Sequence, residues 1–200
     1  MSGDDARNWP VVGLVASAGG VEALLSVLGG LPADLPAAFI VALHSGPGRE
    51  STLAELLARR CALSVEWAAD GEELRPGRVL VIPPGVHGVV RADETLALVE
   101  AGVTPPSRPS GDLLLTTMAS ALGPRAIAVV LSGSGHDGAT GATAVHHLGG
   151  TVFAATGASS AVASMPDATA ERDDAADHVL PAHEIAAALV ERFTGTAGRS

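Results

Sequence analysis

Three short apolar runs separated by helical patterns constrain the fold of this chain more than any other feature. Residues 11–16, 38–43 and 126–131 are apolar almost throughout, and turn-forming residues flank the runs. Such runs are typical of parallel strands buried on both faces of a sheet. Between the first two runs, apolar residues recur over 21–28 at the spacing of one helix face. This alternation predicts an α/β fold with a doubly wound, mostly parallel sheet and helices on both faces, the Rossmann-like three-layer arrangement.

The rest of the chain continues the same alternation with one exception. Further strands are expected at residues 63–67, 78–82, 151–155 and 178–180, and further helices at residues 53–57, 110–122, 139–148 and 185–193. The exception is residues 88–99, where two apolar stretches flank a polar turn and predict a β-hairpin at one edge of the sheet. Ser110 is the expected N-cap of its helix, and Gly123 and Pro124 are expected to end that helix.

The 200 residues suit one domain with a sizeable core, since 47% of them are apolar. Residues 1–9 and 195–200 are polar and are expected to be disordered tails, which leaves residues 10–194 as the domain. The N-terminus is acidic where a secretory signal is basic, and no apolar run approaches the ~20 residues that cross a bilayer. Cys61 is the single cysteine and has no partner for an intrachain disulfide. We therefore expect a cytoplasmic protein.

The charge of the chain excludes several classes of partner. Its 12 basic residues are all arginine and stand against 22 acidic residues, which gives a net charge of −10. A protein that binds duplex nucleic acid needs a cationic surface, and an anionic membrane surface repels a chain of this charge. Aromatic residues make up 2% of the chain, too few for a platform that stacks single-stranded bases.

Polar residues with catalytic chemistry follow the three strongest predicted strands. Ser17 comes directly after the first, His44 after the second, and Asp137 lies in the Gly-rich loop after the third. Ligands of open α/β sheets bind beyond the carboxyl ends of the strands, so these three side chains are expected at one edge. Ser, His and Asp are the parts of an acyl-transfer triad, which is recognised by geometry and not by chain order.

The chemistry of these side chains assigns their expected roles. Ser17 would be the nucleophile, and His44 would be the base that takes its proton and later returns it to the leaving group. Asp137 would hold the imidazole in the useful tautomer. Because a helix is expected to open after Ser17, free N–H groups of residues 18–20 are available for a developing oxyanion. These three residues are Ala18, Gly19 and Gly20.

Each candidate residue also has a simpler interpretation. Ser17 can be the N-cap of the following helix, or residues 17–20 can cradle a phosphate, although they lack the lysine of a P-loop. His44 can be an ordinary loop histidine. Asp137 can be the cap of the helix that begins at Gly138. The sequence alone leaves these alternatives open.

A metal site is a further alternative. His87 and His136 can join His44 and Asp137 as ligands, but their spacings match no tight ligand motif. The acidic stretch 167–177 is expected to be a solvated surface rather than a site. We therefore expect no metal.

The motifs in this order resemble the catalytic domain of the CheB family of chemotaxis-receptor methylesterases, over residues 11–193. Three segments carry the resemblance: Gly13-Leu-Val-Ala-Ser-Ala-Gly-Gly, Val41-Ala-Leu-His and Leu131-Ser-Gly-Ser-Gly-His-Asp-Gly. Four shorter matches support it: Asp70-Gly-x-x-Leu-x-Pro-Gly, Pro83-Pro-Gly-x-His, Arg108-Pro-Ser-x-Asp and Met165-Pro. The resemblance implies that residues 10–194 are a CheB-type catalytic domain with the doubly wound fold already expected.

The resemblance also implies an activity. Family members hydrolyse glutamate methyl esters on the cytoplasmic helices of methyl-accepting chemotaxis receptors and release methanol, and many also deamidate receptor glutamines. The matched positions imply Ser17 as nucleophile with His44 and Asp137 as its catalytic partners. No metal or organic cofactor is implied. Family members usually carry a receiver domain and a linker, and we expect neither in this chain, so a separate receiver-domain regulator is an expected partner.

This sequence departs from the family pattern in the loops around the expected site. Ala18 stands where the family has Thr, Ser134 where it has Met, and Ser164 where it has Gly before Met-Pro. Ser45 and Gly46 stand where Met-Pro usually follows the His. Ser134 and the adjacent Gly135 are counted with residues 18–20 as the oxyanion and substrate loops. These departures motivate one alternative function, a catalytically weakened module that binds receptor helices or a signalling partner.

Overall fold

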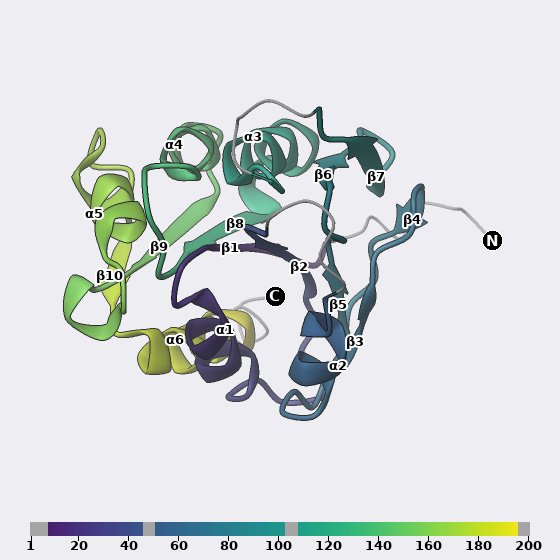
Figure 1. Cartoon of the computed structure of the whole chain (residues 1–200), viewed down its shortest axis with the longest axis horizontal. Coiled ribbons are helices and arrows are strands. Elements are labelled where there is room, and N and C mark those ends of the chain that lie inside the picture. Colours follow the sequence, from purple (N-terminus) through teal and green to yellow (C-terminus); the bar gives the residue numbers. More distant parts are fainter. Residues whose placement is uncertain (1–7, 46–50, 103–107, 196–200) are drawn as a thin grey trace.

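A seven-stranded parallel sheet forms the centre of the computed structural model, which describes residues 8–45, 51–102 and 108–195 (Figure 1). The strand order is β10-β9-β8-β1-β2-β5-β3, and every pairing within it is parallel. Its strands are β1 (Val11–Ala16), β2 (Ala38–Leu43), β3 (Ser64–Trp67), β5 (Arg78–Val81), β8 (Ala126–Val130), β9 (Thr151–Ala155) and β10 (His178–Leu180). The predicted doubly wound fold is confirmed.

The three apolar runs of the sequence form the middle of this sheet. β1 lies between β2 and β8, and all residues of β1 and β8 are buried. A strand in this place is covered by helices on both faces, so an apolar residue at every position is stabilising.

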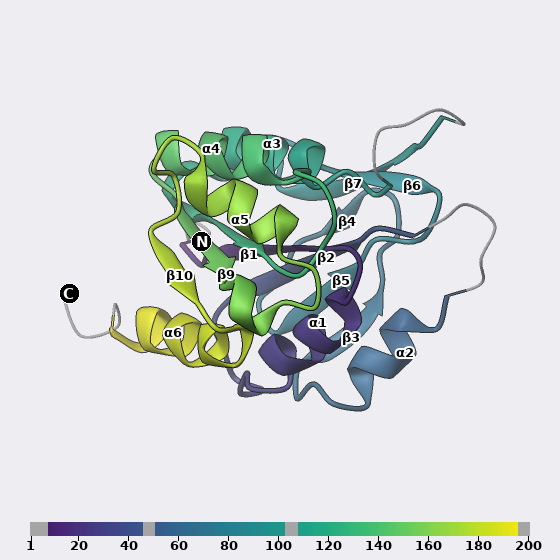
Figure 2. The same ribbon diagram turned by 60° about the vertical axis from the view of Figure 1, so that its left-hand side comes forward.

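Helices cover both faces of the sheet (Figure 2). They are α1 (Gly20–Leu28), α2 (Leu53–Ala58), α3 (Gly111–Leu122), α4 (Ala139–His147), α5 (Ser164–Glu171) and α6 (Ala182–Gly195). Val12 and Leu14 of β1 pack in one core cluster with α1, α2 and α6, while Val11 and Val15 pack in the other with α3, α4 and Met165 of α5. Successive residues of β1 therefore serve opposite layers, as strand geometry requires.

A small antiparallel sheet lies beside α3. The hairpin expected at 88–99 is confirmed as β6 (Val86–Val90) and β7 (Thr95–Glu100), and β4 (Glu72–Glu73) pairs with β7. Thr117 of α3 accepts a hydrogen bond from the N–H of Val90 at 3.1 Å. The hairpin is thereby tied to the helix whose first turn enters the site described below.

Four elements were not expected from the sequence: β4, α5 and two short 3-10 helices, η1 (Gly123–Arg125) and η2 (Gly157–Ser159). α5 occupies the start of the stretch expected to be a solvated surface, and it buries Met165, Pro166 and Thr169 while Asp167 stays exposed. Its single buried turn carries too few apolar residues to show a helical period. Beyond residue 171 the acidic side chains are exposed as expected.

The expected tails at 1–9 and 195–200 lie largely outside the described residues. Of the first, Asn8 and Trp9 are described, and Trp9 packs against the core cluster that contains α3. Gly195 is the last residue of α6. In the part of the chain that is described, no helix has both the length and the apolar character to cross a membrane.

Candidate active site

Backbone hydrogen bonds join the three loops that leave the carboxyl ends of β1, β2 and β8. The N–H of His44 donates to the carbonyl of Ala16 at 2.9 Å, and the N–H of Ser17 donates to the carbonyl of Ser132 at 2.9 Å. The parallel register pairs Ala16 with Leu43, so Ser17 and His44 leave neighbouring strands at the same level. The expected meeting of the three loops at one edge of the sheet is therefore observed.

His44 and Asp137 form a direct hydrogen bond. The distance between His44 Nε2 and Asp137 Oδ2 is 2.7 Å, and the two side chains are only 13% and 12% exposed. Because Asp137 binds Nε2, Nδ1 is the imidazole nitrogen left for a second partner, and among the described residues no hydrogen bond joins Ser17 and His44. An imidazole oriented by a carboxylate is one part of the arrangement that acyl-transfer triads use.

Asp137 lies at the N-terminus of α3 and accepts hydrogen bonds on both oxygens. Oδ1 accepts from Ser110 Oγ at 3.2 Å and from the N–H of Asp112 at 3.0 Å. Oδ2 accepts from the N–H of Gly111 at 2.6 Å and from His44. Free N–H groups and the dipole at a helix N-terminus favour a negative charge there. The carboxylate is thus fixed in orientation before it meets the imidazole.

A second carboxylate joins the same two segments with donor and acceptor exchanged. Asp112 Oδ1, in the first turn of α3, accepts from the N–H groups of Gly138 and Gly141 at 2.9 Å each. The first turn of α3 therefore donates to a carboxylate in the loop before α4, and the first turn of α4 donates to a carboxylate of α3. Gly141 makes this crossing possible, because a Cβ there would lie 2.6 Å from Leu115 Cβ. The interpretation of Asp137 as the cap of α4 is wrong, since its oxygens bind the first turn of α3.

The surroundings of Asp137 lower its pKa. Burial raises the pKa of this carboxyl group, but the hydrogen bonds from His44, Asp112 and Gly111 lower it and outweigh the burial. Each of these bonds favours the ionised form. Asp137 is therefore ionised at neutral pH, as a residue that orients an imidazole must be.

This lowered pKa predicts a specific loss of stability in acid. A carboxyl group with a lower pKa in the folded state stabilises the fold above its unfolded pKa, about 3.9, and this stabilisation disappears as the pH falls through the folded value. We expect the stability difference between wild type and Asp137→Asn to shrink below about pH 4. Urea unfolding between about pH 2.5 and pH 6 measures this difference, and a difference that stays constant across that range contradicts the expectation.

Ser17 does not cap α1. The N-cap residue of that helix is Gly19, which has a left-handed backbone conformation (φ 73°). No side chain forms a capping hydrogen bond at this N-terminus. Left-handed conformations suit glycine because it lacks a Cβ. Ser17 Oγ has no hydrogen-bond partner among the described residues, so the simpler interpretation as an N-cap is wrong. The glycine turn instead lets the chain reverse directly behind Ser17.

Two of the expected oxyanion donors are already engaged. The N–H of Gly20 donates to the carbonyl of Ser17 at 2.8 Å, and the N–H of Gly135 donates to Ser164 Oγ at 3.0 Å. The expectation of a free donor is therefore wrong at Gly20, and Gly135, which was counted with the oxyanion and substrate loops, has no free N–H. Within the described residues the N–H groups of Ala18 and Ser134 form no hydrogen bond, and neither does that of Gly19. The hydrogen bond from Gly20 closes the turn behind Ser17. The hydroxyl that accepts from Gly135 belongs to Ser164, which is one of the departures from the family pattern.

Sequence reasoning missed three serines that support the site. Ser110 contacts Asp137 directly, and its hydroxyl also accepts from the N–H of Leu113, which confirms the predicted N-cap. Ser132 Oγ is buried, contacts the carbonyl of Ala18 at 2.8 Å and accepts from the N–H of Val162 at 3.0 Å. Ser164 braces the loop that carries Asp137, as described above. The cap position of Ser110 and the departure at Ser164 gave a signal in the sequence, but the contacts of these serines with distant segments gave none.

The described residues do not assemble the alternative metal site. His87 Nδ1 accepts a hydrogen bond from the N–H of Ser110 at 3.0 Å, and His136 is exposed. No group of three or more His, Cys, Asp or Glu side chains in the described ranges is placed to hold a metal ion. His44 and Asp137 bind each other instead.

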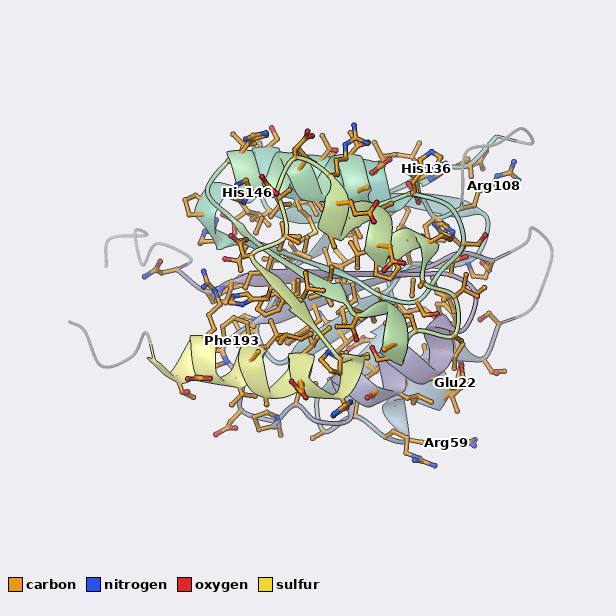
Figure 3. The ribbon with its side chains drawn as sticks, turned by 90° about the vertical axis from the view of Figure 1, so that its left-hand side faces the viewer. Glu22, Arg59, Arg108, His136, His146 and Phe193 are labelled. Atoms are coloured by element: carbon orange, nitrogen blue, oxygen red, sulfur yellow. The ribbon has the colours of Figure 1, made fainter. Side chains whose placement is uncertain are left out.

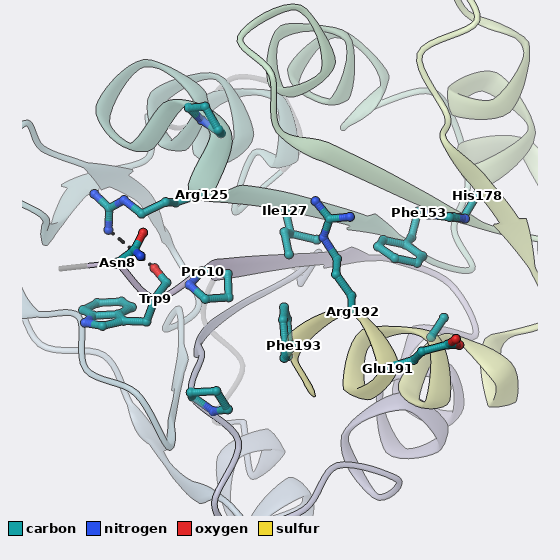
Figure 4. Close-up of a pocket in the computed structure, with 13 residues that line it drawn as sticks. Asn8, Trp9, Pro10, Arg125, Ile127, Phe153, His178, Glu191, Arg192 and Phe193 are labelled. Atoms are coloured by element: carbon teal, nitrogen blue, oxygen red, sulfur yellow. Dashed lines mark hydrogen bonds between the residues drawn. The ribbon is translucent and has the colours of Figure 1, made fainter. Parts of the chain in front are cut away.

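A separate hollow of about 1090 Å³ lies at the amino ends of the strands, away from the loops of the site (Figure 4). It includes Pro10 and Arg125, which immediately precede β1 and β8. Figure 3 shows Arg108 and His136 at one end of the molecule and Phe193, which lines this hollow, towards the other. None of Ser17, His44 and Asp137 lines it, so the chemistry and this hollow occupy different ends of the strands.

Comparisons with known proteins find relatives that cover most of the chain. The family model of the CheB methylesterase matches residues 12–189. A protein-glutamate methylesterase/protein-glutamine glutaminase of Moorella thermoacetica is 41% identical over 189 residues, covering 92% of this chain and 44% of that protein. The protein-glutamate methylesterase FrzG of Myxococcus xanthus is 38% identical over 183 residues, covering 92% of this chain and 54% of that protein.

A solved structure matches the fold as well. The crystal structure of the Thermotoga maritima CheB methylesterase catalytic domain aligns with a TM-score of 0.87 at 34% identity, and the alignment covers 92% of this chain and 99% of that one. The chain spans about half the length of the curated relatives it matches. The family match extends from β1 to α6 and includes every loop of the site. The chain therefore belongs to the CheB methylesterase family.

Proposed function

We propose that this chain is a serine hydrolase that removes methyl esters from glutamate side chains of methyl-accepting chemotaxis receptors. The observation that carries the proposal is the hydrogen bond of 2.7 Å between His44 Nε2 and Asp137 Oδ2 at the strand edge where Ser17 lies. Relatives that are named protein-glutamate methylesterases support the choice of substrate. Residues 10–194 act as the catalytic domain in this proposal.

The reaction proceeds in two acyl-transfer steps. Ser17 Oγ attacks the ester carbonyl while His44 Nδ1 takes the hydroxyl proton. The tetrahedral intermediate then collapses, His44 returns the proton to the leaving oxygen, and methanol departs from an acyl-Ser17 ester. A water molecule attacks this ester with His44 again as base, which releases the glutamate carboxyl group and restores Ser17.

The backbone around Ser17 supplies donors for the developing oxyanion. The N–H groups of Ala18, Gly19 and Ser134 are the candidates, because the N–H groups of Gly20 and Gly135 are engaged. Backbone donors act through the N–H, so the departures at Ala18 and Ser134 leave this contribution available. Those departures change only the side chains that meet the substrate.

Deamidation of receptor glutamines uses the same acyl-Ser17 intermediate. An amide nitrogen leaves only after it gains a proton, and His44 supplies that proton, so ammonia departs where methanol did. The names of several relatives include protein-glutamine glutaminase, which supports this second reaction. The substrate segments are cytoplasmic receptor helices, and a separate receiver-domain protein is the proposed regulator.

Release of methanol from a methylated receptor fragment tests the proposed function. We expect methanol from the wild type and at least about 10⁴-fold less from Ser17→Ala, because the hydroxyl is the nucleophile that forms the acyl-enzyme. Ser120→Ala, an exposed serine of α3, is the matched control and keeps wild-type activity. A wild type that binds the fragment but releases no methanol overturns the proposal and favours the alternative, a weakened binding module.

A further inference from the structure

His87 lies on β6, outside the triad, and its side chain reaches Ser110, the first of the residues at the start of α3 that donate hydrogen bonds to Asp137. Its Nδ1 accepts the hydrogen bond from the N–H of Ser110 at 3.0 Å. Ser110 is only 6% exposed, so this N–H has little access to water. A buried N–H without an acceptor pays the full cost of its lost hydration. His87 therefore anchors the start of α3 to the small antiparallel sheet.

The position of Ser110 determines most of the hydrogen bonds on Asp137. Its hydroxyl donates to Oδ1, and the next two N–H groups in the chain, those of Gly111 and Asp112, donate to Oδ2 and Oδ1. A shift of the Ser110 backbone therefore moves three donors together. Because Asp137 Oδ2 also holds His44, such a shift reorients the imidazole that acts on Ser17.

The bond to Ser110 requires an uncharged His87 ring. An accepting Nδ1 has a lone pair, so the proton lies on Nε2. Burial lowers the pKa of His87, the charge of Asp137 raises it and that of Arg108 lowers it further, with a net lowering. Protonation puts a second N–H opposite the N–H of Ser110, which removes the bond.

We propose that neutral His87 is a positioning residue for Asp137 and, through Asp137, for His44, because it holds the N-cap residue of α3 in place. This inference rests on the function proposed above. His87 acts through Ser110 and exchanges no proton with the substrate. The site thus has a support on a second sheet, and the support is lost when the ring takes up a proton.

Two variants of His87 separate positioning from packing. His87→Leu keeps bulk but removes the acceptor, and we expect kcat to fall by about 10²-fold at unchanged KM, as a small misplacement of catalytic groups does. His87→Asn offers Oδ1 as an acceptor near the place of Nδ1 and does not titrate, so it restores most of kcat. It also makes the acid side of the pH–rate profile shallower than in the wild type, because the titration of residue 87 is removed. His183→Leu, an exposed histidine of α6, is the control.

Hydrogen exchange of the N–H groups of residues 110–112 supplies a readout that needs no activity. We expect these three amides to exchange slowly in the wild type and in His87→Asn, and faster in His87→Leu, while amides of β1 stay equally protected in all three. If the wild type releases no methanol, the proposed function fails, but the exchange data still test the positioning role.

Three results overturn the inference. The first is a His87→Leu variant with wild-type kcat, and the second is unchanged exchange at residues 110–112 in that variant. The third is a His87→Asn variant as slow as His87→Leu, which assigns the loss to packing of the imidazole ring. Thermal unfolding of each variant shows whether the fold persists. If His87→Leu does not fold, the pH–rate profile of His87→Asn alone tests the positioning role.

Discussion

Ser17→Ala is expected to remove nearly all hydrolysis, and adding His44→Ala to it is expected to cost almost nothing more. The loss in kcat for either single variant should be on the order of 10⁴ to 10⁶. Residues that act as a unit give such non-additive losses, since each is useless without the other. For independent contributions the two losses in free energy would add.

The geometry gives the reason for this unit behaviour. In the proposed mechanism His44 is bound through Nε2 to Asp137 and moves a proton at Nδ1. Without Ser17 Oγ there is no hydroxyl for it to deprotonate. The activity left in both variants then comes from binding and from backbone donors such as the N–H of Ala18, and these are unchanged between them.

Methanol release by Ser17→Ala, His44→Ala and the double variant, with the receptor fragment in excess, measures the three losses. Circular dichroism and thermal unfolding show that each variant is folded. Ser120→Ala again serves as the control for a serine replacement. Losses that multiply in the double variant would count against a shared mechanism at these two residues.

The sheet and the meeting of the loops that carry Ser17, His44 and Asp137 could be predicted from the sequence because both follow from local pattern and one geometric rule. Apolar runs at β1, β2 and β8 identify central strands, and the carboxyl ends of parallel strands share an edge. Only the loop lengths after each strand decide which side chain reaches that edge. Ser17 and His44 directly follow β1 and β2, so their placement had little freedom, whereas Asp137 lies in the longer loop after β8.

The hydrogen bonds that hold Asp137 could not be predicted, because they join segments that are distant in the chain. Gly111 and Asp137 are 26 residues apart, and no periodicity connects the first turn of α3 with the loop after β8. Beside its place in the triad, the one structural role that the sequence suggested for Asp137 was a cap of the nearest helix, α4. The exchange of carboxylates between α3 and α4 depends on how closely the helices cross, which the glycine at 141 permits.

The free donors around Ser17 were predicted only in part for a similar reason. A helix start implies unpaired N–H groups, but the turn at Gly19 uses the N–H of Gly20, and Ser164 from a separate helix uses that of Gly135. Which donor remains free depends on tertiary contacts of single hydroxyl and carbonyl groups. Propensity and spacing carry no information on such contacts.

Asp137→Asn is expected to lower kcat by about 10⁴-fold, because the amide no longer selects the productive imidazole tautomer. It should also destabilise the fold. Both carboxylate oxygens accept a backbone N–H, from Asp112 on Oδ1 and from Gly111 on Oδ2. An asparagine has one acceptor oxygen, so in either orientation its NH₂ group faces one of these N–H groups, at a cost of about 1–3 kcal/mol.

Asp112→Asn is the matched control, since that carboxylate uses its oxygens differently. Both of its hydrogen bonds, from Gly138 and Gly141, end on Oδ1 alone. An asparagine that places its oxygen there keeps both bonds, so the free energy of unfolding should change by less than about 1 kcal/mol. Urea unfolding at pH 7 compares the two variants, and equal destabilisation by both would show that Asp137 is not held through two oxygens.

The combination of readouts distinguishes the two roles of Asp137. If its carboxylate only braced α3, Asp137→Asn would lose stability while the remaining folded protein kept its kcat. If it only oriented His44, kcat would fall without a loss of stability. Because the carboxylate is bound by His44 on Oδ2 and by the first turn of α3 on both oxygens, we expect both losses in this one variant. The same group then fixes the helix and the base, so the rigidity of α3 is transmitted directly to the imidazole.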